Sequence, residues 1–206
     1  GNHKLANDVK EMLGAHVGKL EISHNVRPSL ETEDLEPGRH ELALLMIKLR
    51  QRQIKGVDEL HLWSAGSLLP TAYAQGRIIR FLSKLYESTR GLLCVNVGAS
   101  ATSVAAGFNG ELTLGVYPQY GLGENLAGLL QQTDINDIVR WLQLDISPNM
   151  LREYMFQKSL YPASIPATKD EQALSQAIAR QALYLAVRAA QKDFPAHARP
   201  ARTGMM

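Results

Sequence analysis

The stretch GLLCVNVGASATSVAAGFNGE, residues 91–111, decides the fold of this chain. It begins with the apolar run 92–97, which is typical of a strand covered on both faces. The dipeptide Asn109-Gly110 tolerates the positive φ that both central positions of a type I′ hairpin turn require. We therefore predict an antiparallel meander of three strands near residues 92–97, 102–108 and 111–117.

The turn that follows the first of these strands is small and polar. Small side chains leave backbone amides unshielded, and such amides can bind phosphate oxygens together with neighbouring hydroxyls. A tight hairpin turn that uses small residues for steric reasons explains the same pattern. For Gly121 and Gly123, the alternative is a tight loop that leads to a helix. The predicted cofactor-binding residues are Asn96, Gly98, Ala99, Ser100, Ala101, Thr102 and Ser103, with Gly121 and Gly123 after the third strand.

The order strand, glycine turn, strand, hairpin, strand resembles the phosphate loop of the actin, sugar kinase and Hsp70 ATPase superfamily. This resemblance implies a ribonuclease H-like α/β domain of the actin/Hsp70 type. Members of that superfamily usually carry an Asp just before the Val/Ile-Gly pair, where it manages a metal-bound water. Asn96 stands there in this chain. An amide is neutral and a poorer partner for a hydrated cation than a carboxylate is.

Several flanking segments form an ordered series over about residues 22 to 190: Asn25–Pro28, Leu35–Arg39, Lys55–Val57, Leu69–Ala72, Gly121–Asn125 and the arginine-tryptophan helix Ile138–Leu142. In this order they resemble successive motifs of the glutamate mutase L (MutL) family, which is unrelated to the DNA mismatch repair protein of that abbreviation. Both acidic residues of the family signature D-I-G-G-A-T-T-D are absent from the aligned residues 96–103.

The MutL resemblance implies an accessory protein encoded with a coenzyme B12-dependent mutase. Such a protein is thought to act as an ATP-using chaperone or reactivator, with a mutase subunit as its partner. ATP and Mg²⁺ are then the expected cofactors of the full-length protein, whereas this chain requires none. Only one phosphate loop is visible, so we expect an excised portion or a natural remnant of a longer protein.

Around the meander we predict an α/β fold with a mixed sheet flanked by helices and a helical C-terminal third. Residues 17–24 read as a strand. A second strand near 59–64 is expected to run parallel to the meander and to reach it through a right-handed crossover over residues 57–97. The expected helices are 6–13, 41–53, one after Pro70-Thr71, 133–142 with Thr133 as cap, 149–161 capped by Ser147, and 169–192 opened by a capping box at Thr168 and Glu171.

The predicted domain division follows these elements. Residues 57–130 form the ribonuclease H-like core with the phosphate-loop-like turn, and residues 1–56 are an N-terminal part of the same unit. Residues 131–195 form a helical extension, and 196–206 a flexible tail.

Composition excludes several function classes. The chain has 206 residues, of which 45% are apolar and 20% charged, with a net charge of +2. This balance gives no reason to expect nucleic-acid or membrane partners, and the sequence has no apolar run of the ~18 residues that a membrane helix needs. The single cysteine, Cys94, reads as a small core residue, and a reducing cytoplasm fits it best.

No catalytic constellation emerges from the remaining candidates. The six histidines lack metal-ligand spacing. A ribonuclease H-type nuclease would need a carboxylate where Asn96 stands. Two function classes remain: a nucleotide-binding accessory domain with a degenerate site, and a nucleotide-independent interaction module on the same scaffold. We expect no ATPase activity from this chain alone, and the sequence does not indicate an oligomeric state.

Overall fold

The structure is a computed structural model that describes residues 3–18, 20–86, 91–123, 125–143 and 146–198. It divides into two compact units, Gly1–Tyr73 and Ala74–Met206. The division predicted from the sequence, with boundaries after residues 56, 130 and 195, stays a prediction.

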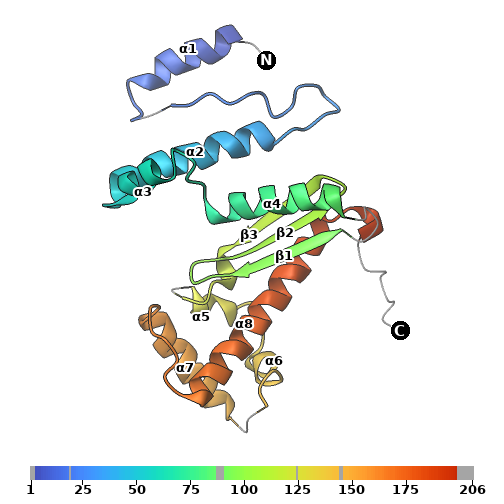
Figure 1. Cartoon of the computed structure of the whole chain (residues 1–206). Coiled ribbons are helices and arrows are strands. Elements are labelled where there is room, and N and C mark those ends of the chain that lie inside the picture. The colour runs from blue at the N-terminus through green and yellow to red at the C-terminus, as the bar shows by residue number, and fades with distance from the viewer. Residues whose placement is uncertain (1–2, 19, 87–90, 124, 144–145, 199–206) are drawn as a thin grey trace. The chain divides into compact units, whose positions relative to one another are not determined.

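The first unit contains three helices, α1 (His3–Gly14), α2 (Glu36–Gln53) and α3 (Val57–Trp63) (Figure 1). A proline in its first turn opens α2, where the missing amide costs nothing. The N-cap of α3 is Gly56, whose φ of 92° is easily reached only without a side chain. The helices predicted at 6–13 and 41–53 are confirmed, and both begin earlier than predicted.

Both strands predicted in the first unit are wrong. Residues 60–63 lie in α3, so the sheet gains no parallel strand there and the crossover over 57–97 does not exist. A short apolar run does not distinguish strand from helix, and here Asp58 and Glu59 favour a helix by placing negative charge in its first turn. Residues 17–18 and 20–24 are irregular, Ile22 is 46% exposed, and none of the strands among the described residues pairs with this segment.

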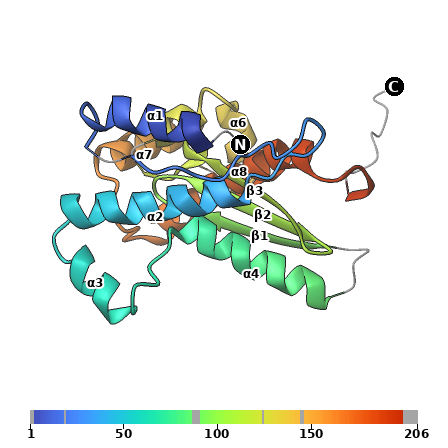
Figure 2. The same ribbon diagram turned by 90° about the horizontal axis from the view of Figure 1, so that it is seen from above.

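The second unit is built on the predicted meander. Strands β1 (Leu92–Val97), β2 (Thr102–Phe108) and β3 (Glu111–Tyr117) pair antiparallel in the order β1-β2-β3, which can be followed in Figure 2. Asn109 and Gly110 close the hairpin with φ values of 50° and 85°, as the turn chemistry requires. The predicted mixed sheet is wrong for the described residues, because every strand pair among them is antiparallel.

The central strand β2 is buried along its whole length, because helices cover both faces of the sheet. Helix α4 (Thr71–Leu85), of which residues 74–85 belong to this unit, lies on one face and α8 (Lys169–Ala190) on the other (Figure 1). Strand side chains alternate between faces, so Ser103 and Gly107 meet α4 whereas Val104 and Phe108 join the core under α8.

Helix α4 also holds the hairpin. Ser83 accepts a hydrogen bond from the Gly110 amide at 3.0 Å, and Arg80 Nε donates to the Gly110 carbonyl at 3.1 Å. A Cβ on Gly107 would lie 2.8 Å from the Ile79 carbonyl oxygen, so the glycine lets helix and strand approach closely.

The helical C-terminal third completes the core with α5 (Leu126–Leu129), α6 (Ile135–Val139), α7 (Pro148–Leu160) and α8. Ser147 caps α7, and the Thr168–Glu171 capping box opens α8, as predicted. The described residues also form the 3₁₀ turns η1 (Pro118–Tyr120), η2 (Gln191–Asp193) and η3 (Ala196–Ala198).

The helix predicted over 133–142 is shorter than expected. Its N-cap is Asp134, whose carboxylate accepts the Asn136 amide at 2.8 Å, and the helix ends at Val139. Thr133 instead donates its hydroxyl to Asp137 at 2.9 Å. Of the predicted tail 196–206, residues 199–206 lie outside the described residues, and 196–198 form η3.

Candidate functional site

The candidate site is the turn of residues 98–101 between β1 and β2. The Gly98 amide closes it by donating to the Ala101 carbonyl at 3.1 Å, directly after the Val97–Thr102 strand pair. The loop 121–123 lies against the turn, because Leu122 N donates to Gly98 O at 3.0 Å and Gly123 N to Ala99 O at 2.7 Å. The structure thus brings together the two segments that the sequence singled out.

The glycines of the second loop make this contact sterically possible. A Cβ on Gly121 would lie 2.7 Å from both the Ala99 carbonyl oxygen and the Ser100 carbonyl carbon. A Cβ on Gly123 would lie 3.0 Å from Ala99 O. Packing of one backbone on another therefore accounts for both glycines without a ligand.

Two of the predicted hydroxyls already have protein partners. Thr102 is fully buried and donates to the Tyr120 carbonyl at 2.8 Å. Ser103 is 5% exposed and donates to Gln75 Oε1 at 2.7 Å. Both side chains stabilise the base of the turn and do not face solvent.

Gln75 is a site residue that sequence patterns do not single out. From α4 it accepts from Ser103 and donates through Nε2 to the Cys94 carbonyl at 3.1 Å, so it bridges β1 and β2. Its partner lies 28 positions along the chain. No local signal in a helical glutamine indicates a contact at that distance.

The polar groups left for a ligand are few and lie at the tip of the turn. Ala99 and Ser100 are exposed. Within the described part of the chain, the amides of Ala99, Ser100 and Ala101 donate to no protein acceptor. No residue from 98 to 103 has a positive φ, so the turn lacks the alternating right- and left-handed backbone of an anion-binding nest. Three amides and one hydroxyl can contact a single phosphate group.

Asn96 is exposed at the end of β1, opposite Ser103 and on the face that α4 covers. Among the residues that the structure describes, no three His, Cys, Asp or Glu side chains gather in an arrangement that could hold a metal ion. The side chain at position 96 is a neutral amide, so it would add no charge to a cation site.

One ionisable group near the site has a shifted pKa. Tyr117 pairs with Thr102 across the sheet. Burial raises the pKa of the Tyr117 phenol above 10, with smaller contributions from Asp193 and Tyr120. The phenol therefore stays neutral over the physiological range and brings no charge to the turn.

Comparison with known proteins places the chain in a family. The family described as MutL protein matches residues 1–200. The chain therefore belongs to the MutL family. Protein MutL of Clostridium tetanomorphum is 23% identical over 205 residues, which cover 91% of this chain and 44% of that protein. The chain thus spans less than half the length of this relative.

No solved structure matches the chain, so its membership of the ribonuclease H-like superfamily stays a prediction. In the part of the chain that the structure describes, no helix combines the length and the apolar character needed to cross a bilayer.

Proposed function

We propose that this chain is a domain of an accessory protein that serves a coenzyme B12-dependent glutamate mutase. Membership of the MutL family over residues 1–200 supports this role. The proposed partner is a mutase subunit, and the proposed activity of the whole protein is that of a chaperone or reactivator. A reducing cytoplasm is the proposed compartment, since Cys94 is a free thiol.

The proposal extends to a degenerate nucleotide site at the turn 98–101. The observation that carries it is the packing of loop 121–123 on this turn, which holds the backbone of residues 98 and 99 in place. A turn held from behind presents its outer amides to a phosphate with little further ordering, and preorganisation of that kind strengthens binding. ATP with Mg²⁺ is the proposed ligand of the full-length protein, in which further residues would have to supply the metal ligands.

A nucleotide-independent interaction module is the second candidate. It is favoured by the internal hydrogen bonds of Thr102 and Ser103 and by the steric explanation of Gly121 and Gly123. On this alternative the same turn and loop stabilise a surface that contacts a protein.

Isothermal titration calorimetry on the full-length protein separates the two candidates. ATP, ADP and GTP are titrated with Mg²⁺, and the purified mutase subunit is titrated in a parallel series with and without nucleotide. The proposal predicts nucleotide binding that is weakened by Gly98→Val. Mutase binding without any nucleotide binding would support the interaction module instead. If the full-length protein binds neither nucleotide nor the mutase subunit, the accessory role is contradicted.

A further inference from the structure

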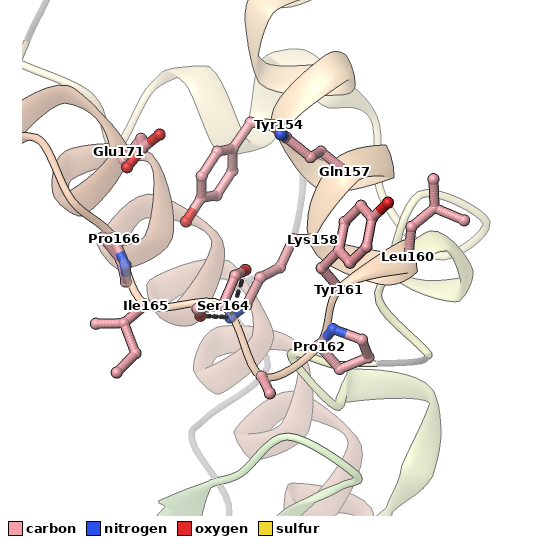
Figure 3. A pocket seen from close by; sticks show the side chains of 11 residues that line it. Tyr154, Gln157, Lys158, Leu160, Tyr161, Pro162, Ser164, Ile165, Pro166 and Glu171 are labelled. Atoms are coloured by element: carbon pink, nitrogen blue, oxygen red, sulfur yellow. Dashed lines mark hydrogen bonds between the residues drawn. The ribbon is translucent and has the colours of Figure 1, made fainter.

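A cavity of about 670 Å³ lies between the C-terminal half of α7, the loop after it and the first turn of α8 (Figure 3). Pockets that bind small molecules measure roughly 300–1,000 Å³, so this one has a suitable size. Its lining residues are Tyr154, Gln157, Lys158, Leu160, Tyr161, Pro162, Ala163, Ser164, Ile165, Pro166 and Glu171.

Most of the cavity wall is apolar. The rings of Tyr154 and Tyr161 stand on two sides of it, and Pro162 and Pro166 flank the loop between them (Figure 3). Ile165 is 84% exposed and Tyr161 66%, which is unusual for such large side chains in a cavity wall. A ligand with an apolar body would remove this surface from water, and burial of apolar surface favours binding.

The wall is held in shape by local hydrogen bonds. The carboxylate of Glu171 accepts from the amides of Ala167 at 2.6 Å and Thr168 at 3.3 Å, and the Thr168 hydroxyl accepts from the Glu171 amide at 3.1 Å. The Ser164 amide donates to the Tyr161 carbonyl at 3.0 Å. A ligand therefore meets a preformed surface, which lowers the entropic cost of binding.

The lining of the cavity includes a cation, the ammonium group of Lys158. Lys158 Nζ donates to the Ser164 carbonyl and lies 3.5 Å from the Ser164 hydroxyl. Within the described residues, no carboxylate forms an ion pair with Lys158. An ammonium group has three donors, and Ser164 fixes the position of this one without neutralising its charge.

Glu171, the carboxylate among the lining residues, forms no ion pair with Lys158 in the described part of the chain. Glu171 directs its carboxylate to the amides at the start of α8, where the helix dipole also favours a negative charge. Burial raises the pKa of the Tyr154 phenol, and Glu171 adds to this rise, while a hydrogen bond with Ser175 opposes it. Tyr154 therefore remains a neutral hydroxyl at physiological pH.

We propose that this cavity binds a small carboxylic acid with an aromatic or branched apolar body. The carboxylate contacts Lys158 Nζ, and the apolar body lies between the rings of Tyr154 and Tyr161. The proposal rests on the cavity of the second unit and does not depend on the proposed nucleotide site.

Three probes of similar size and different charge test the proposal: 3-phenylpropanoate, 3-phenylpropanol and 3-phenylpropylamine. Each is titrated into the ¹⁵N-labelled chain and followed by amide chemical shifts. We expect 3-phenylpropanoate to bind at least ten times more tightly than the amine, with shifts at residues 154–171. Equal affinities, shifts elsewhere, or no binding at millimolar concentration would overturn the proposal.

Four variants assign the selectivity to the cavity. Lys158→Met should reduce the preference for the anion to less than threefold, and Lys158→Arg should keep it. Tyr161→Ala should weaken all three probes by a similar factor. Lys192→Met is the control, because it removes the same charge beyond the far end of α8, and it should leave the preference for the anion intact. If Lys192→Met removes this preference, general electrostatic attraction explains the binding and the proposal is wrong.

Discussion

Replacing Gly121 by alanine tests whether the loop 121–123 supports the turn 98–101. The added Cβ would lie 2.7 Å from two backbone atoms of the turn, Ala99 O and Ser100 C, where ordinary contacts begin near 3.4 Å. Backbone atoms cannot rotate away, so turn and loop must separate by several tenths of an ångström. Overpacking of this kind costs about 1–3 kcal/mol.

The separation also weakens the two hydrogen bonds between loop and turn, Leu122 N to Gly98 O and Gly123 N to Ala99 O. Each is worth about 1 kcal/mol, so the total loss of unfolding free energy is about 2–4 kcal/mol. A domain of this size loses about 2–4 °C in Tm per kcal/mol, so we expect Tm to fall by about 4–16 °C.

Differential scanning calorimetry measures this shift, and Gly128→Ala is the matched control. Gly128 lies in α5 with open space around its Cβ position, so an alanine there should leave Tm unchanged or raise it slightly. A Gly121→Ala protein that melts within 1 °C of the Gly128→Ala protein would refute the close packing of loop and turn.

Three further predictions concern other parts of the chain. Gln181 is 1% exposed, accepts from Trp141 Nε1 at 2.8 Å and donates to Thr133 Oγ1 at 2.7 Å. Gln181→Leu should therefore lower the free energy of unfolding in denaturant by about 2–3 kcal/mol. A loss below about 0.5 kcal/mol would show that these hydrogen bonds between α8 and the residues flanking α6 contribute nothing. The pKa of Tyr154 is raised in the folded state, so its contribution to stability is fully present below pH 10, where the phenol is protonated in both states, and is lost as the pH rises through the folded-state pKa. Tyr154→Phe should therefore flatten the decline of Tm above pH 10. An unchanged slope would argue against a raised pKa of Tyr154. This chain alone should show no appreciable phosphate release from Mg²⁺-ATP in a coupled assay, because Asn96 supplies no carboxylate to a metal shell; robust turnover abolished by Asn96→Ala would contradict this.

Features set by local chemistry could be predicted from the sequence. The hairpin turn at Asn109-Gly110 depends only on the backbone conformation of these two residues. The caps formed by Ser147 and Thr168 depend only on residues up to three positions away. The three strands were predicted from the apolar run 92–97 and the Asn109-Gly110 turn. The contact of loop 121–123 with the turn was not derivable from spacing, although both segments were singled out as site residues.

The failures arose where the deciding interactions are weak or distant. Residues 60–63 contain too few apolar positions to show whether the hydrophobic period is that of a strand or of a helix. The acidic residues in the first turn of α3 favour the helix. Thr133 and Asp134 are both good caps, but the Thr133 hydroxyl donates to Asp137 and accepts from Gln181, and the aspartate takes the capping role. The cavity beside Lys158 depends on how α7 meets α8, which no local pattern encodes.

We propose that the turn 98–101 is a degenerate phosphate site of a MutL accessory protein. The most direct test is the Mg²⁺-ATP affinity of the full-length protein, measured by calorimetry for two substitutions. Asn96→Asp should raise the affinity by restoring a carboxylate near the phosphates, whereas Gly98→Val should lower it, because even its Cβ would lie 3.0 Å from Ala101 O and distort the turn. Opposite shifts of at least threefold are the predicted result; unchanged affinity in both variants would contradict the claim.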